Sequence, residues 1–238
     1  MNDRLVSTAI NILLLLLIIT FASSTHGAPP ASVKILFEIK MGDLTIGQGI
    51  DTLQHDSKSY WLSSKITPRG LASLFLDEVE RESSGSISET GLVPERFTEK
   101  GNKKKGDSEA HFEWEKKILT LVMREGQQTV ALPTDSIDQA VLPYQFSFKT
   151  ALPEETIINI TDGRRLKQYV YERKGDQTLT TPIGILKTAY FKKIVASDTD
   201  RQFEFWLSYD HHLLPVKIRF VDKKGNAIES NVQAVSIN

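Results

Sequence analysis

The residue types that most often carry chemistry are scattered along this sequence. His211 and His212 are the only adjacent histidines. Neighbouring residues of a strand point to opposite faces, which is poor geometry for chelating one metal ion. Cysteine is absent, so thiol catalysis and cysteine-ligated metal sites are excluded. No nucleophile elbow, His-Glu-x-x-His motif or phosphate loop is present. We therefore expect no enzyme activity, no cofactor and no metal site.

Two charged patterns have both a chemical and a structural interpretation. The acids between Asp77 and Glu82 could include a glycosidase pair, but they lie where a solvated strand or loop surface places acids. The run Lys103–Lys105 could bind a polyanion, but no aromatic residue is interleaved with it, and its composition favours a solvated loop tip. With 29 basic and 30 acidic residues, no global field attracts nucleic acid, and we expect no nucleic-acid partner.

The N-terminus has the layout of a secretory signal. Arg4 precedes the apolar run at 12–19, and small residues follow at 22–24. We expect a signal peptide over residues 1–27, cleaved after Ser24 or Gly27, and a single β domain over 28–238. An uncleaved anchor is the alternative, but Ser7, Thr8 and Asn11 interrupt the run, which falls short of about 20 apolar residues. After cleavage the protein should be soluble, with no integral membrane span.

The rest of the chain reads mainly as strands. Period-two alternation and turn residues predict strands over residues 33–40, 44–53, 59–67, 77–89 with a kink at Gly85, 96–100, 109–121, 156–160, 164–173 and 183–194. A short helical turn is expected over 71–76. The longer helix candidate, 135–150, contains Pro143, which removes a hydrogen bond and clashes with the preceding turn. We expect that helix to be broken or shortened.

The C-terminal third predicts a hairpin with a specific register. A four-residue loop over 210–213 gives one apolar face and one charged face. The predicted apolar pairs are Tyr209 with Leu214, Leu207 with Val216, Phe205 with Ile218, and Phe203 with Phe220; the opposite face pairs Trp206 with Lys217 and Glu204 with Arg219. A three-residue loop over 223–225 then places Gly225 at a left-handed position. It pairs Phe220 with Ile228, Val216 with Val232, and Leu214 with Ala234.

The apolar face of this hairpin is the candidate ligand surface. Trp61, Trp114 and Trp206 each lie in a predicted strand and could line an aromatic groove, but ordinary strand packing is the favoured interpretation. Trp206 should be a structural residue on the opposite face. If a groove exists, its ligand-binding residues are Phe203, Phe205, Leu207, Tyr209, Val216 and Ile218.

Several short motifs, in this order and spacing, resemble one known family. They are Ser84-Gly85-Ser86-Ile87, Gly91-Leu92-Val93-Pro94, Leu132-Pro133 through Asp138, Tyr169, Thr181-Pro182-Ile183-Gly184, Trp206-Leu207, Leu214-Pro215-Val216 and Gly225. The chain resembles the bacterial exported family catalogued only as domain of unknown function 3108. The resemblance implies a location in the Gram-negative periplasm and an outline similar to lipoprotein-carrier half-barrels. It implies no catalytic residues.

Pattern and resemblance together give the expected fold class and function. The fold class is mainly β: an antiparallel curved sheet, a half-barrel or open barrel of about ten strands, with one or two short helices. The expected function is a non-enzymatic periplasmic binding or carrier module for an apolar envelope component. The alternative is a structural or interaction protein that docks a partner in envelope assembly through its sheet edge or outer face. The sequence leaves the ligand, the partner and the oligomeric state open.

Overall fold

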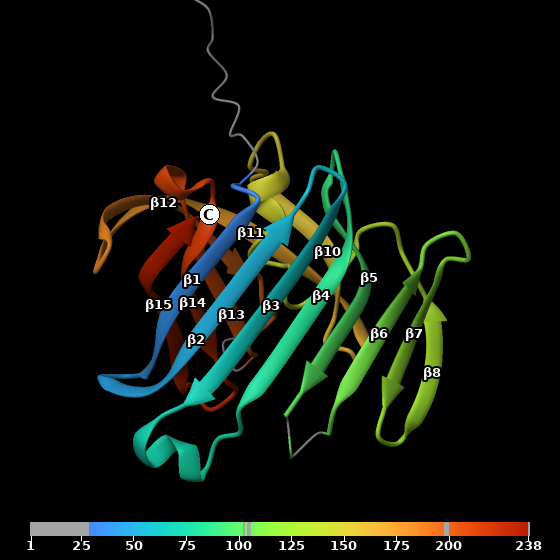
Figure 1. Cartoon of the computed structure of the whole chain (residues 1–238), viewed down its shortest axis with the longest axis horizontal. Helices are drawn as coiled ribbons and strands as arrows, with labels where there is room; N and C mark the ends of the chain where they lie inside the picture. Colours follow the sequence, from blue (N-terminus) through green and yellow to red (C-terminus); the bar gives the residue numbers. More distant parts are fainter. Residues whose placement is uncertain (1–28, 102, 104–105, 198–199, 238) are drawn as a thin grey trace, which may run out of the picture.

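A single curved sheet contains every strand of the described chain (Figure 1). The computed structural model describes residues 29–101, 103, 106–197 and 200–237. The expected signal peptide lies outside these residues, as do two of the three lysines of the predicted loop tip. Fifteen strands join in the order β8-β7-β6-β5-β4-β3-β2-β1-β15-β14-β13-β12-β11-β10-β9. Neighbours are antiparallel except for the parallel pair β9 and β10. The edge strands β8 and β9 do not pair with each other, so the sheet is open.

The elements follow one another closely. The strands are β1 Ser32–Met41, β2 Leu44–His55, β3 Ser59–Pro68, β4 Val79–Ser88, β5 Gly91–Lys100, β6 Ser108–Glu113, β7 Ile118–Met123, β8 Gly126–Ala131, β9 Ser136–Asp138, β10 Glu155–Thr161, β11 Leu166–Thr181, β12 Gly184–Lys193, β13 Gln202–Ser208, β14 Leu214–Val221 and β15 Ala227–Ile237. Three short 3₁₀ turns complete the described chain: η1 Gly70–Leu74, η2 Gln145–Phe148 and η3 Tyr209–His211.

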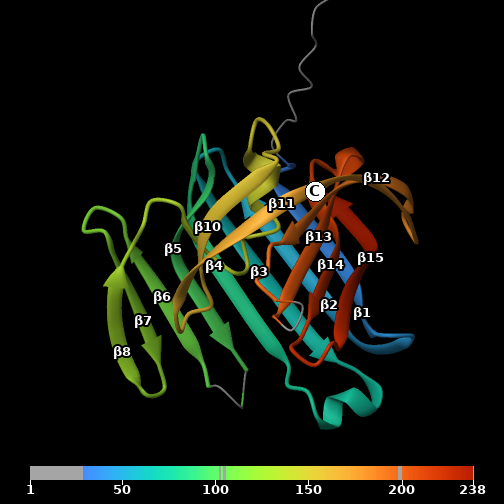
Figure 2. The same cartoon turned by 180° about the vertical axis from the view of Figure 1, so that it is seen from behind.

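Alternation along the central strands explains why the sheet has a buried concave face. In β1 the residues Val33, Ile35, Phe37 and Ile39 are all buried, while their neighbours face outward. The sheet curls until β10 and β11 cross behind β3 to β5, as the two opposite views show (Figures 1 and 2). Residues 132–149, here called the plug, enter the space between these layers.

The strand count corrects the expectation of about ten strands. The strand expected over 109–121 is two strands, β6 and β7. The turn between them is closed by the Lys117 amide, which donates to the Trp114 carbonyl at 3.2 Å, and Lys117 has a left-handed φ of 55°. Non-glycine residues rarely adopt this conformation, so the sequence carries no obvious turn signal there. β8 was not expected at all.

The segment 135–150, where a broken or shortened helix is expected, forms no α-helix, and the described residues contain none elsewhere. Ser136–Asp138 instead pairs with β10 as β9, and only Gln145–Phe148 forms a 3₁₀ turn. Pro143 lies between them, where it blocks a continuous helix. Contact with the sheet then determines the path of this segment.

The hairpin of β13 and β14 confirms four of the six predicted pairs. Phe203 pairs with Phe220, Glu204 with Arg219, Phe205 with Ile218, and Trp206 with Lys217. A register shift after Trp206 then places Leu207 opposite Pro215 and Ser208 opposite Leu214. The predicted pairs of Leu207 with Val216 and of Tyr209 with Leu214 are therefore wrong.

The shift arises from a longer loop than expected. The loop spans η3 and two left-handed residues, His212 at φ 53° and Leu213 at φ 57°. Leu213 is only 1% exposed, and its amide donates to the Ser208 carbonyl at 2.8 Å. Burying this leucine offsets the backbone strain that two consecutive left-handed residues impose.

The charged face of the hairpin and the next turn are as predicted. Lys217 Nζ lies 5.1 Å from the centre of the Trp206 ring, and Arg219 contacts Glu204 at 3.2 Å. Gly225 is left-handed with φ 85°, and Phe220 pairs with Ile228. The other pairs predicted for this turn lie beyond the paired stretch, which ends at Lys217 opposite Asn231.

The kink predicted at Gly85 is present in β4. The register with β5 shifts between Ser84 and Gly85. A Cβ atom at Gly85 would lie 2.1 Å from the Val93 carbonyl oxygen, so no side chain can be placed there without moving the backbone.

Candidate functional site

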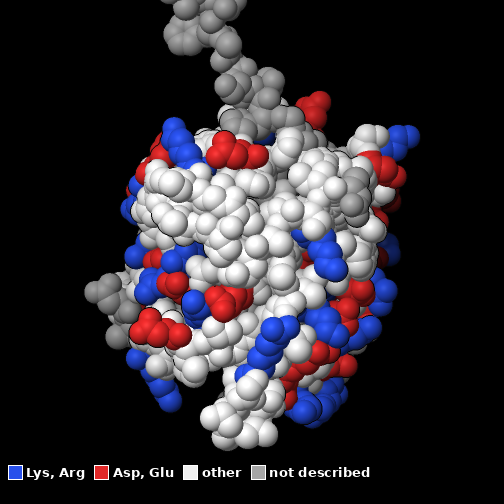
Figure 3. Space-filling model, turned by 60° about the vertical axis from the view of Figure 1, so that its left-hand side comes forward, with Lys and Arg blue, Asp and Glu red and all other residues white. Residues whose placement is uncertain are grey.

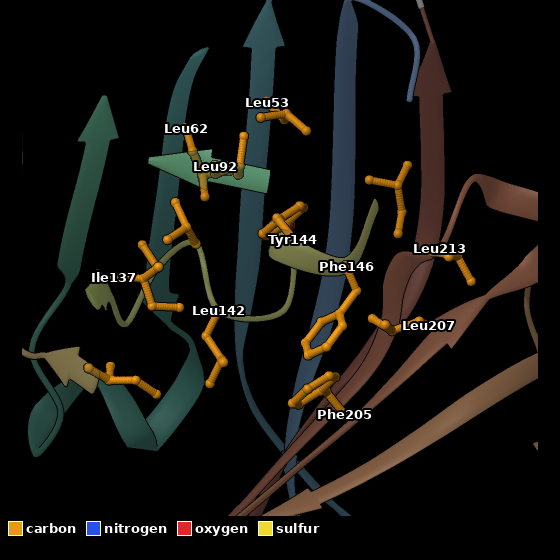
Figure 4. Packing of buried hydrophobic residues seen from close by; sticks show 14 of the residues in the cluster. Leu53, Leu62, Leu92, Ile137, Leu142, Tyr144, Phe146, Phe205, Leu207 and Leu213 are labelled. Atoms are coloured by element: carbon orange, nitrogen blue, oxygen red, sulfur yellow. The ribbon is translucent and has the colours of Figure 1, made fainter. Parts of the chain in front are cut away.

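The concave face of the sheet is the place where a ligand would bind in an open barrel, and the plug fills it. Val141, Leu142, Tyr144 and Phe146 are each at most 3% exposed. Figure 4 shows Tyr144 and Phe146 pointing from the plug towards the surrounding strands. The interior is therefore a packed core in this structure.

The plug covers part of the candidate ligand surface. Phe146 packs against the Phe205 ring, as Figure 4 shows, with centroids 5.4 Å apart. Its ring also lies 4.6 Å from that of Phe191. The strands bring the candidate residues together on one face. Of the six, Phe205, Leu207 and Val216 are at most 1% exposed, whereas Phe203, Tyr209 and Ile218 are half-buried at its margin. Their role as ligand-binding residues stays a prediction.

The three tryptophans occupy different environments. Trp206 stacks on Tyr190 with centroids 4.6 Å apart, and its indole N–H donates to Gln177 Oε1 at 2.8 Å. Trp114 is half-buried and donates to the Pro94 carbonyl at 2.7 Å. Trp61 is 37% exposed. They line no common groove, and Trp206 packs on the face opposite the plug.

A hydrogen bond from Tyr144 fixes the middle of the plug to β2. Its hydroxyl donates to Asp51 Oδ2 at 2.6 Å, and both residues are buried. Burial raises the pKa of the Asp51 carboxyl, and the Tyr144 hydrogen bond opposes that shift. Burial also raises the pKa of Tyr144 well above its usual range, so the phenol keeps its proton as donor.

Asp138 fixes the start of the plug to β4. Its Oδ2 accepts a 2.6 Å hydrogen bond from Ser83, whose hydroxyl also contacts the Tyr60 hydroxyl at 2.9 Å. Its Oδ1 accepts from the amides of Ala140 and Val141 at 2.8 and 3.2 Å, which forms the first turn of the plug. Burial raises the pKa of Asp138 to about 6.

Gln145 fixes the end of the plug to β5. Its Oε1 accepts from the Leu92 amide at 2.9 Å, and its Nε2 donates to the Thr90 carbonyl at 3.3 Å. The side chain lies against Gly91, where a Cβ atom would come within 2.6 Å of Nε2. The Gly91-Leu92 motif thus provides the bare backbone that the plug requires.

A buried ion cluster connects the plug to both layers. Glu99, which is 3% exposed, contacts Arg81 at 2.8 Å and Arg164 at 2.9 Å, and Gln139 donates to it at 3.1 Å. Burial raises the pKa of Glu99, but attraction and hydrogen bonds from the two arginines outweigh this and hold the pKa below its ordinary value. The cluster joins β4, β5 and the β10–β11 turn.

The cavity beside the plug is small. It has a volume of about 80 Å³ and lies where Thr134–Ile137, Gln145 and Lys149 face β10. Burial lowers the pKa of Lys149, while Asp135 opposes the shift. Small-molecule sites usually measure about 300–1,000 Å³. This cavity has room for a few water molecules and not for an acyl chain.

A larger hollow, of about 540 Å³, lies at the ends of β5 to β7. Its lining mixes basic and acidic side chains, among them Arg96, Lys100 and Arg124 with Glu99 and Glu109. An apolar ligand would leave these charges without water, so the hollow does not suit one.

No three histidine or acidic residues of the described chain lie close enough together to hold a metal ion. His211 Nδ1 contacts the Ser208 hydroxyl at 3.1 Å within the β13–β14 loop. Over the same residues, no helix is both long enough and apolar enough to cross a membrane.

Sequence reasoning missed Asp51, Asp138, Tyr144 and Gln145 as the residues that hold the interior together. A signal was present in the apolar residues around Pro143, which are too dense for a surface loop. Their partners could not be found, because Tyr144 and Asp51 are 93 residues apart in the chain.

The open curved sheet with a filled interior defines a class of barrel-like β proteins. The chain belongs to the family described as "Protein of unknown function (DUF3108)", whose model matches residues 36–231. This confirms the resemblance seen in the sequence. The fold is similar to a β-barrel-like protein of domain of unknown function DUF1849 from Brucella abortus, with a TM-score of 0.58 and 8% identity over 89% of this chain and 100% of that one. No curated protein matches the sequence.

Proposed function

We propose that this chain is a non-enzymatic, exported interaction protein of the bacterial envelope that docks a partner through its outer face or sheet edge. The filled concave face carries the proposal. The plug covers Phe205, and the cavity beside the plug measures about 80 Å³, which argues against an apolar ligand in the described interior. The outer surfaces remain for binding.

The exposed edge of β8 is one surface suited to docking. The residues of Gly126–Ala131 are exposed except for Val130, and the strand is at the end of the sheet order. An edge strand presents backbone N–H and C=O groups to which an extended segment can pair. A side-chain contact from Gln128 Nε2 to the Arg164 carbonyl, at 3.1 Å, ties this edge to the β10–β11 turn.

The carrier of an apolar envelope component is the second candidate. Separate hydrogen bonds hold the plug at Asp51, Asp138 and Gln145. A ligand could break these bonds one at a time, which supports a carrier whose plug opens. Releasing the plug would expose at least four large apolar side chains, and each exposure costs about 1.5–3 kcal/mol of free energy. The combined cost is comparable to the total stability of a typical domain, about 5–15 kcal/mol. The interaction function needs no such opening.

Photo-crosslinking in cells tests the interaction function. A crosslinker placed at Thr129 on β8 should give one discrete adduct with another protein. The same crosslinker at Ile185, which is 73% exposed on β12, is the control. If no adduct forms at β8 and an acyl lipid co-purifies with the protein, the interaction function is wrong and the carrier function takes its place.

A further inference from the structure

Exposed apolar side chains gather at one end of the sheet. Of eleven exposed large hydrophobic residues in the described chain, six lie where β1 and β3 end and β2 begins. They form the apolar end: Met41, Leu44, Leu71, Leu74, Phe75 and Leu76. Such clustering marks a contact surface, because scattered single hydrophobics would need no explanation.

The turn η1 and the residues after it form the tip of this end. Leu71, Leu74 and Phe75 are 80%, 73% and 84% exposed. Residues 70–76 carry no charge, and Figure 3 shows an uncharged lobe that projects beyond the lower end of the molecule. The amides of Phe75 and Leu76 both donate to the Ala72 carbonyl, at 3.1 and 2.9 Å. The lobe therefore keeps its shape without a covering element.

Three basic residues lie at the same end of the sheet as the lobe. Arg69 directly precedes it, and Lys223 and Lys224 lie at the same end of the sheet, since Ile228 near the start of β15 pairs with Met41. Within the described residues these three cations form no ion pair. Of the acids at this end, Glu78 contacts Lys65 at 2.7 Å and Asp77 contacts Lys103 at 3.5 Å, while Asp43 lies in the β1–β2 turn and Asp222 directly precedes Lys223.

We infer that the apolar end binds an anionic lipid surface, with the η1 lobe inserted into the interfacial region of the bilayer. A convex lobe offers little matched area to a protein partner, which needs about 800 Å² per side. A bilayer needs no shape complementarity and accepts leucine and phenylalanine below a ring of basic side chains. This inference does not depend on the partner that β8 binds.

Tryptophan fluorescence tests insertion of the lobe itself. Phe75→Trp places a reporter at the tip, and Ile185→Trp places a matched reporter near the start of β12, outside the apolar end, where Ile185 is 73% exposed. The full chain is expressed, and the protein recovered from cells is mixed with vesicles of equal parts phosphatidylglycerol and phosphatidylcholine.

Brominated acyl chains should quench the indole introduced at position 75 and shift its emission to the blue. The indole introduced at position 185 should stay unchanged. The signal of the unsubstituted protein corrects for its own three tryptophans. Equal quenching of the two introduced indoles would overturn the inference. So would a dimer in which the position-75 reporter is shielded, because a second copy would then be the occupant.

A second pair of variants measures affinity. Leu74→Ser with Phe75→Ser should reduce partition to these vesicles about tenfold or more, whereas Ile157→Ser with Ile185→Ser should not. Vesicles of phosphatidylcholine alone should bind the unsubstituted protein more weakly. An equal loss of partition in the two double variants would contradict a specific role of the lobe.

Discussion

The Tyr144 hydroxyl donates to the Asp51 carboxylate at 2.6 Å and joins the plug to a strand 93 residues earlier in the chain. Tyr144→Phe keeps the ring and leaves the buried carboxylate without this donor. The free energy of unfolding should fall by about 1–3 kcal/mol, the cost of an unsatisfied buried acceptor. Urea unfolding measures it. Tyr169→Phe, at a half-buried tyrosine of β11, should change stability by less than about 0.5 kcal/mol. If the two substitutions lowered the free energy of unfolding equally, the Tyr144–Asp51 hydrogen bond would not have this stabilising role.

Phe146 should contribute to stability more than any exposed phenylalanine. Phe146→Ala opens a cavity against Phe191 and Phe205 and should lower the free energy of unfolding by about 3–5 kcal/mol. Phe75→Ala removes the same atoms from a residue that is 84% exposed and should cost about 0.5 kcal/mol at most. A loss below about 1 kcal/mol at Phe146 would mean that the plug is not packed in solution.

Asp138 should make the protein less stable as pH rises. Its folded pKa of about 6 lies above the ordinary value of 3.8 because burial disfavours the charge. The folded state therefore holds the proton more tightly, and this stabilisation is complete below pH 3.8 and lost as pH rises through 6. The difference of about two pKa units corresponds to about 3 kcal/mol.

The variant Asp138→Asn isolates this contribution from other titrating groups. Its amide oxygen can still accept from Ala140 and Val141, and its N–H₂ can donate to Ser83. Between pH 4 and pH 7 the unsubstituted protein should lose about 2–2.5 kcal/mol relative to the variant, because part of the full effect already lies below pH 4. Parallel stability curves over that range would show that Asp138 does not titrate as its burial requires.

Gly91 should tolerate alanine less well than Gly184 does. Both have left-handed φ, 118° and 126°, so both substitutions strain the backbone. Only at Gly91 would the new Cβ meet Gln145, at 2.6 Å, whereas Gly184 has no atom within 4 Å. Gly91→Ala should therefore cost at least about 1 kcal/mol more in thermal or urea unfolding. Adding Gln145→Ala to Gly91→Ala should remove most of that excess loss of stability. If the stability losses of the two single variants simply add in the double variant, the Cβ does not clash with Gln145.

The sequence predicts the sheet and much of the β13–β14 register, because one register has to give an apolar face and a charge-paired face of the hairpin at the same time. Phe203 and Phe205 pair with Phe220 and Ile218 as the alternation requires. The predicted pairing is wrong after Trp206, because the loop that follows is shaped by the burial of Leu213 in the core and not by local turn residues. The plug was missed for the same reason. Its residues have no regular period, and their partners come from β2, β4 and β5, which only the folded chain brings together.

Native mass spectrometry with lipid extraction tests the central claim that the concave face is closed by the chain's own plug. The protein should be recovered from cells that express the full chain and sprayed without detergent. We predict a mass equal to the polypeptide alone and no stoichiometric acyl lipid in the extract. One bound lipid per chain, released when Phe205 or Leu207 is replaced by Asp in a variant that still folds, would contradict the claim and establish the interior as a ligand site.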